Sequence, residues 1–252
     1  MFHRMQEIGY DYIVTGHYAR VEYDEKRDRY LLKKAVDDTK DQSYVLYMLT
    51  QEQLAHVKLP LGGLRKEQVR VIDEKHGFIN ARKHDSQDIC FVPDGDYAKF
   101  IEKYTGKKTP EGDFVDKEGN YIGRHKGIIH YTIGQRRGLG IPAASRLYVC
   151  EISPKTNTVV LGDNADLFSS ELEADSVNLI SVDNLSEPKR VTAKIRYRHK
   201  EQPATAWQTP DGILHVKFDE PQRAITKGQA VVMYDGDEVV GGGVINKIYS
   251  QS

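Results

Sequence analysis

Cysteine is scarce in this sequence of 252 residues. Only Cys90 and Cys150 are present, sixty positions apart, and no CxxC pair occurs. Because a disulfide framework or a zinc knuckle needs several cysteines at short spacings, both are excluded. A chemically active cysteine in this chain therefore acts alone or with a thiol from another polypeptide.

Long apolar runs are also missing. No stretch reaches the roughly 18 apolar residues that a membrane-spanning helix needs, and residues 1–7 (MFHRMQE) lack the apolar core of a signal peptide. The hydrophobic fraction of 39% still supports well-packed cores. The sequence predicts a globular, cytoplasmic protein with no membrane partner.

A strong excess of one charge sign is absent as well, since the net charge is -1 at pH 7. The charges are nevertheless segregated along the chain. Residues 119–150 contain no acidic side chain but several basic ones, whereas residues 163–187 contain acidic side chains and no Lys or Arg. This pattern predicts that a polyanion binds one face of the protein and is repelled by another.

The N-terminal part of the chain has the pattern of half an α/β unit. A short helix is followed by a mostly apolar strand over residues 10–14 and a turn over residues 15–17. Such a strand is normally buried on both faces between parallel neighbours, which arrive through crossover helices that this sequence does not supply upstream. We therefore expect Met1 to be an internal methionine or the start of a truncated gene model.

Helix signals follow in order. A helix is predicted over residues 44–49, a capping box at Thr50 and Gln53 begins a second, and a third over residues 66–76 ends at Gly77. The next predicted elements are a short strand over 89–92 and an amphipathic helix over 97–104.

Three domains are predicted, giving an α/β plus β fold class. Residues 1–92 form the remainder of the α/β domain. Residues 93–144 form a small α+β domain with a hairpin at 117–120 and a basic loop at 134–140. Residues 145–252 have the short strands and turn signals of a small antiparallel β-barrel, in which glycines 241–243 form a bulge or bend.

A cationic strand is predicted over residues 190–200. Period-2 alternation turns Val191, Ala193, Ile195 and Tyr197 toward the core. The opposite face carries Arg190, Thr192, Lys194, Arg196, Arg198 and Lys200. This spacing suits successive phosphates of RNA, and it equally suits an edge strand that its charges protect from aggregation.

Three further segments have both a structural and a functional interpretation. Cys90 is either a buried structural thiol or a nucleophile whose thiolate is stabilised by nearby basic residues, whereas Cys150 is predicted to lie in the core. Gly16 and His17 form either a nucleotide-side turn or a plain tight turn. Residues 40–43 (KDQS) either contact a ligand or cap the following helix.

Taken together, five segments of the chain resemble the tRNA-specific 2-thiouridylase family. They are residues 15–19 (TGHYA), 40–44 (KDQSY), 86–91 (SQDICF), 134–140 (GQRRGLG) and 196–198 (RYR). They occur in the family's order and span nearly the whole chain. The resemblance implies the C-terminal half of an ATP-pyrophosphatase domain of the PP-loop, adenine nucleotide alpha hydrolase-like type, then a small central domain and a C-terminal tRNA-binding barrel.

The resemblance also implies a reaction. ATP, with Mg²⁺, adenylates the C2 oxygen of the wobble uridine. A cysteine persulfide, loaded by a cysteine desulfurase or a sulfur carrier, then delivers sulfur, and a second cysteine completes its release. The target uridine must leave the anticodon stack to be reached.

Site residues follow from the resemblance position by position. Cys90 resembles the persulfide-bearing cysteine, and Gly16 resembles the backbone position beside ATP. The residues that resemble RNA-facing positions are His17, Lys40, Asp41, Gln42, Arg196, Tyr197 and Gln229.

The sequence departs from the family pattern at two points. It contains neither the Ser-Gly-Gly-Val-Asp-Ser pyrophosphate loop nor the first catalytic cysteine, and Cys150 is expected in a barrel strand, where it cannot replace that cysteine. These 252 residues alone are therefore expected to bind tRNA weakly and not to thiolate it.

Two alternatives come from other classes. A non-catalytic RNA-binding barrel explains the cationic strand equally well but does not explain Cys90. A thiol hydrolase that uses Cys90 with His84 lacks an identifiable third group to orient the histidine.

Overall fold

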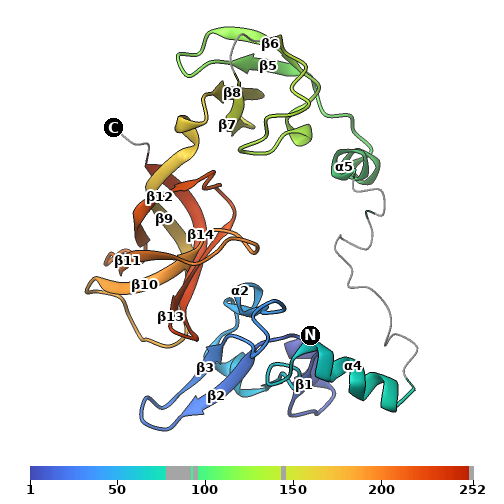
Figure 1. Ribbon diagram of the computed structural model, residues 1–252, viewed down its shortest axis with the longest axis vertical. Coiled ribbons are helices and arrows are strands. Elements are labelled where there is room, and N and C mark those ends of the chain that lie inside the picture. Colours follow the sequence, from blue (N-terminus) through green and yellow to red (C-terminus); the bar gives the residue numbers. More distant parts are fainter. Residues whose placement is uncertain (78–91, 93–95, 143–145, 250–252) are drawn as a thin grey trace. The chain divides into compact units, whose positions relative to one another are not determined.

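The computed structural model describes residues 1–77, 92, 96–142 and 146–249. The chain forms two compact units. The first comprises Met1–Lys83, Ser170–Glu220 and Lys227–Tyr249, and the second comprises His84–Ser169 and Pro221–Thr226. Figure 1 labels their elements. Among the described residues, no helix has the length and apolarity that crossing a bilayer requires.

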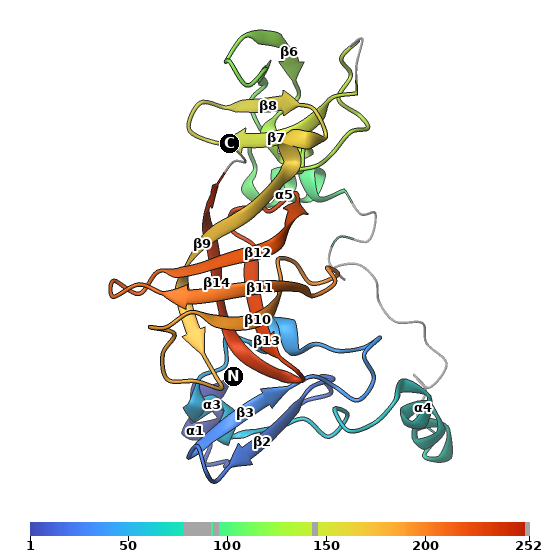
Figure 2. The same cartoon turned by 60° about the vertical axis from the view of Figure 1, so that its left-hand side comes forward.

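A closed antiparallel barrel of six strands dominates the first unit (Figure 2). Its strands are β9 (Phe168–Leu179), β10 (Lys189–Lys194), β11 (Gln202–Gln208), β12 (Leu214–Arg223), β13 (Ala230–Asp235) and β14 (Glu238–Tyr249). They follow the order β13-β10-β11-β12-β9-β14, and pairing of β13 with β14 closes the ring. Alternate residues such as Ala204, Val216 and Phe218 are buried in the interior. The predicted C-terminal barrel is confirmed.

The three glycines of β14 lie where the barrel bends, as predicted. The register shifts between Met233 and Tyr234, and again between Gly242 and Val244. A Cβ atom on Gly242 would lie 2.5 Å from the carbonyl oxygen of Val231 and 2.7 Å from the Tyr47 ring. Glycine is required here because another chain segment packs directly against the strand backbone.

The N-terminal part of the first unit joins the barrel sheet. The hairpin of β2 (Arg20–Asp24) and β3 (Arg29–Lys33) extends the sheet through β14. A parallel pair is formed by β1 (Ile13–Val14) and β4 (Val57–Lys58), after helix α1 (Phe2–Glu7).

The strand predicted over residues 10–14 is therefore shorter than expected. Only Ile13 and Val14 are in a strand, and Val14 is 66% exposed. The expectation of burial on both faces is wrong for the described structure, because β1 has one strand neighbour there and burial of both faces needs covering layers.

The remaining helices of this unit are α2 (Ser43–Leu46), α3 (Gln51–Ala55) and α4 (Lys66–Lys75). The capping box of Thr50 and Gln53 forms in both directions, and Gly77 adopts the predicted left-handed conformation with φ of 69°. Helix α2 is shorter than the predicted segment over 44–49.

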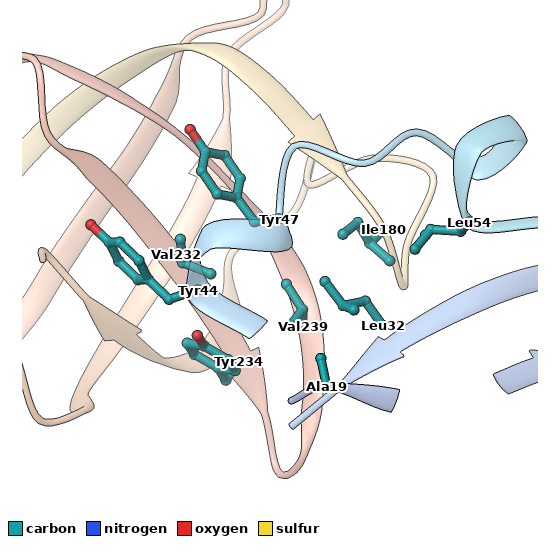
Figure 3. Close-up of a cluster of buried hydrophobic side chains, with 9 residues drawn as sticks. All are labelled: Ala19, Leu32, Tyr44, Tyr47, Leu54, Ile180, Val232, Tyr234 and Val239. Atoms are coloured by element: carbon teal, nitrogen blue, oxygen red, sulfur yellow. The ribbon is translucent and has the colours of Figure 1, made fainter. Parts of the chain in front are cut away.

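Two tyrosines at α2 join this N-terminal part to the barrel. Tyr44 on α2 and Tyr47 directly after it belong to a buried cluster with side chains of both parts (Figure 3). The full cluster is Ala19, Leu32, Tyr44, Tyr47, Leu54, Ile180, Val232, Tyr234 and Val239. Because both sides contribute fully buried side chains, the hydrophobic effect holds them as one body.

The second unit contains a four-stranded mixed sheet and one longer helix. Its elements are α5 (Tyr97–Thr105), β5 (Gly112–Val115), β6 (Tyr121–His125), the 3₁₀ turns Ile128–His130 and Ala165–Leu167, β7 (Tyr148–Ser153) and β8 (Thr158–Gly162). The sheet order is β6-β5-β8-β7, with β5 and β8 parallel. Phe114, Val149 and Val159 are fully buried at its centre.

Two predictions are confirmed in this unit and a third is corrected. Helix α5 begins at the cap of Asp96, and Asp116 bonds Asn120 across the predicted hairpin turn. The strand expected around Cys150 in the barrel forms as β7, but it belongs to the mixed sheet and not to the barrel, because it pairs with β8. The domain boundaries at residues 92 and 144 stay predictions.

Candidate RNA interface

The segment over residues 40–43 is held in a fixed turn by its own aspartate. The Asp41 carboxylate accepts the backbone N–H groups of Ala35 (3.0 Å) and Ser43 (3.3 Å) and the hydroxyl of Ser43 (2.7 Å). A carboxylate with several donors is rigid. The predicted contact residue Asp41 therefore shapes the turn, and its half-buried neighbours Lys40 and Gln42 are carried by it.

Gln42 ties this turn to the segment that contains Gly16 and His17. Its side-chain oxygen accepts the N–H of Tyr18 at 2.9 Å, and its own N–H donates to the Tyr18 carbonyl at 2.8 Å. The hydroxyl of Thr15 lies 2.5 Å from Nδ1 of His17 and accepts its backbone N–H at 3.2 Å. Residues that are more than twenty positions apart in sequence thus become neighbours.

Tyr197 connects the same turn to the barrel. Its hydroxyl donates to the carbonyl oxygen of Asp41 at 3.3 Å, and its ring lies 6.0 Å from that of Tyr44. The ammonium of Lys194 lies 5.8 Å from the Tyr44 ring and 6.0 Å from the Tyr197 ring, within cation–π range. The hydroxyl of Tyr44 donates to the carbonyl of Ala230 at 2.9 Å, next to the exposed Gln229.

All seven predicted RNA-facing residues lie in the first unit, on segments that these contacts link. We call them the interface cluster: His17, Lys40, Asp41, Gln42, Arg196, Tyr197 and Gln229. Tyr44 was not predicted as part of it. The only sequence signal was its place in the segment KDQSY, because its role depends on packing against a strand nearly two hundred residues away.

Exposed cations lie in this cluster and beside it. Arg196, Arg198 and Lys200 are all exposed, and within the described part of the chain none of the three forms an ion pair. Burial first, and then the nearby charges of Arg196 and Lys194, lower the pKa of His199 below its ordinary value. Both observations indicate a positive potential at this end of the barrel.

The cationic strand predicted over 190–200 needs correction. Strand β10 ends at Lys194, and residues 195–199 form turns. Val191, Ala193 and Ile195 are buried as predicted, but Tyr197 is 42% exposed because the alternation stops before it.

The beginning of that strand is also no site for phosphate. Arg190 forms two hydrogen bonds with the Asp219 carboxylate, at 2.8 and 2.7 Å, and Lys189 pairs with Asp235. The free cations therefore lie in the turn after β10 and not in a straight ladder.

The other predicted site residues are Gly16 and Cys90. Gly16 is exposed after β1, and a Cβ atom there would meet only Leu61, at 3.5 Å, so a ligand can approach its backbone. Cys90 and His84 lie outside the described residues. Among those that are described, no three His, Cys, Asp or Glu side chains come together as metal ligands.

Cys150 lies on β7 and is half-buried, not fully in the core as predicted. Burial first, and then the charge of Asp166, raise the pKa of its thiol to about 11. The thiolate is therefore rare at neutral pH, and Cys150 is a poor nucleophile.

We expect Cys150 to react slowly with iodoacetamide. A pKa of about 11 in place of the ordinary 9.0 lowers the thiolate fraction at pH 8 about 100-fold. The rate of Cys150 labelling in a Cys90→Ser variant, followed by mass spectrometry, checks this. Labelling as fast as that of a cysteine in a short peptide would contradict it.

Comparison with known proteins agrees with this architecture. Residues 1–94 match the tRNA methyl transferase HUP domain, residues 98–163 the tRNA methyl transferase PRC-barrel domain, and residues 169–245 the aminomethyltransferase beta-barrel domain. These three matches define a class of protein in which a HUP domain is followed by a PRC-barrel domain and a β-barrel domain.

Curated relatives narrow the class. The chain is 56% identical to the tRNA-specific 2-thiouridylase MnmA of Clostridioides difficile (strain 630) over 98% of its own length and 68% of the relative. It is 54% identical to the protein of that name from Acetivibrio thermocellus, over 97% and 68% of the two chains. It is 52% identical to tRNA-specific 2-thiouridylase MnmA 1 of Caldanaerobacter subterraneus, over 98% and 68%. The chain belongs to the tRNA-specific 2-thiouridylase family.

Proposed function

We propose that this chain acts in the ATP-dependent 2-thiolation of the wobble uridine of tRNA, as a sulfurtransferase in the cytoplasm. The observation that carries the proposal is identity above 50% to curated 2-thiouridylases over nearly the whole chain. The convergence of Lys40, Asp41 and Gln42 with Tyr197 supports it independently.

On the RNA side, the interface cluster receives the anticodon arm. Arg196 and Arg198 are exposed cations with no ion-pair partner among the residues that the structure describes, and here they neutralise phosphates. Lys40 and Gln42 lie on a turn that hydrogen bonds hold in place, and His17 lies on a neighbouring segment that is hydrogen-bonded to it. They therefore contact RNA without a large loss of conformational entropy.

On the nucleotide side, ATP is a substrate that binds with Mg²⁺ beside the backbone of Gly16. The C2 oxygen of uridine attacks the α-phosphate, pyrophosphate leaves, and the oxygen becomes part of a good leaving group. The exposed glycine, with no side chain in the way, supports close approach of the nucleotide.

Cys90 carries the sulfur in this proposal. A cysteine desulfurase or sulfur carrier loads it as a persulfide. The terminal sulfur attacks C2 of the uridine and AMP leaves. A second thiol then attacks the sulfur of Cys90, which frees the thiouridine and leaves a disulfide. The raised pKa of Cys150 argues against that thiol being Cys150.

The test is persulfide loading of the 252-residue chain by a cysteine desulfurase with ³⁵S-cysteine. Label is expected on the unmodified chain and on Cys150→Ser, and it should be absent from Cys90→Ser. Unlabelled protein that still binds tRNA would instead support a non-catalytic RNA-binding barrel.

Thiolation is measured in the same preparation. The 252 residues contain no Ser-Gly-Gly-Val-Asp-Ser segment, so by themselves they are expected to form no 2-thiouridine from ATP, tRNA and the loaded persulfide. A retarded tRNA band on a mercury-containing gel would refute this.

A further inference from the structure

The loop over residues 134–140 of the second unit carries two adjacent arginines, and we propose that it is a second RNA-binding site, for backbone phosphates of the tRNA. This inference rests on the proposed function for the identity of its partner. Arg136 and Arg137 are both exposed. Within the described residues, neither guanidinium has a hydrogen-bond or ion-pair partner.

The loop is rigid because apolar side chains hold both of its ends. Ile133 before it and Leu139 within its last turn pack on the buried core around Phe114. The arginines lie between these two anchors. Such a loop presents its charges in a fixed place, so little conformational entropy is lost on binding.

Hydrogen bonds also brace the backbone of the loop. The Gln135 side chain accepts the Thr132 N–H at 3.0 Å and donates to the Arg137 carbonyl at 2.9 Å. Gly134 donates to Val149 at 2.8 Å, and Val149 donates back to Gln135 at 3.0 Å. These contacts do not involve the guanidinium groups, which stay available for a ligand.

Arg223 also holds the loop, through a hydrogen bond to its first residue. Its guanidinium donates to Asn164 at 3.2 Å and to the carbonyl of Gly134 at 3.4 Å, and lies 5.6 Å from the Tyr148 ring. This arginine has structural contacts on its guanidinium. Arg136 and Arg137, by contrast, have none among the described residues.

The surrounding charges favour a polyanion as that partner. Residues 119–150 contain no acidic side chain, so the loop has no counter-charge of its own in sequence. Arg124, by contrast, lies 3.4 Å from the Asp113 carboxylate. Two neighbouring guanidiniums with flanking glycines suit a chain of phosphates, because glycine lets the RNA backbone come close and each arginine takes one phosphate.

The experiment compares the tRNA affinity of three proteins. They are the unmodified 252-residue chain, the loop double variant Arg136→Ala/Arg137→Ala, and the control double variant Lys107→Ala/Lys108→Ala. The control removes two exposed cations from the same unit, outside the loop. We expect the loop variant to raise Kd about tenfold at 0.1 M salt and to lower the slope of log K against log salt by about 1.5, as loss of two phosphate contacts predicts. The control should change Kd less than twofold.

Three outcomes would overturn the inference while leaving the proposed function intact. In the first, the loop variant has an unchanged Kd for tRNA. In the second, the control variant loses as much tRNA affinity as the loop variant. In the third, the loop variant binds tRNA normally but is loaded poorly with persulfide, which would make the loop a docking site for the sulfur donor. Failure of the unmodified chain to bind tRNA at low salt would instead refute the proposed function. Equal melting temperatures of the variants establish that folding is unaffected.

Discussion

Replacement of Gly242 by valine is expected to destabilise the first unit severely. The new Cβ would lie 2.5 Å from the carbonyl oxygen of Val231 and 2.7 Å from the Tyr47 ring. The contact with Val231 involves the backbone of the paired strand, so a rotamer change cannot relieve it. The contact with the Tyr47 ring pushes Tyr47, and the adjoining helix α2, away from the barrel. We expect a loss of at least about 3 kcal/mol, or roughly 6–12 °C in Tm.

Thermal unfolding, followed by the fluorescence of Trp207, measures this effect. Trp207 is the single tryptophan and lies on β11, so its signal reports the barrel. Gly63→Ala is the matched control, because nothing lies within 4 Å of its added Cβ atom. Its Tm should stay within about 2 °C. A Gly242→Val protein with the same Tm as the control would show that the close approach of Tyr47 does not exist in solution.

Removal of Arg196 and Arg198 together is expected to weaken tRNA binding about thirtyfold at 0.1 M salt. Both are exposed in the turn that Tyr197 joins to the segment of Lys40 and Gln42, and neither forms an ion pair with any described residue. Their loss removes phosphate contacts at the centre of the interface cluster, so the salt slope should also fall by about 1.5. Fluorescence anisotropy of labelled tRNA across a salt series measures both quantities.

The matched control is the double variant Lys189→Ala/Arg190→Ala. It also removes two positive charges, from the beginning of strand β10 and not from the turn after it. Those two cations already pair with Asp235 and Asp219. We therefore expect less than a threefold change in Kd. Equal losses in both variants would mean that the whole barrel attracts RNA by net charge alone, without a local site.

Local features of the fold were predictable from the sequence because neighbouring residues decide them. The capping box of Thr50 and Gln53 needs only residues three positions apart. The left-handed Gly77 and the turn closed by Asp116 and Asn120 are equally local. Each depends on backbone hydrogen bonds within one turn, so the sequence pattern is sufficient.

The cationic strand was predicted in part for the same reason. Alternation correctly placed Val191, Ala193 and Ile195 in the interior. It could not show that the strand ends at Lys194, or that Arg190 forms an ion pair with Asp219. Strand pairing and ion pairs across the sheet join residues that are distant in sequence.

By itself, the sequence determined the family, the order of an α/β segment and two β regions, and the residue types that we propose to face RNA, since matching motifs and periodicity are properties of the chain. Only the tertiary structure decided that Asp41 shapes a turn, that Tyr44 and Tyr197 join this turn to the barrel, and that Arg196, Arg198 and Lys200 have no ion-pair partner among the described residues. The physical reason is that burial and hydrogen bonding depend on which distant segments pack together. Packing of the segment that contains α2 on the barrel brings residues 40–44 and 194–198 together, and no local pattern records that contact.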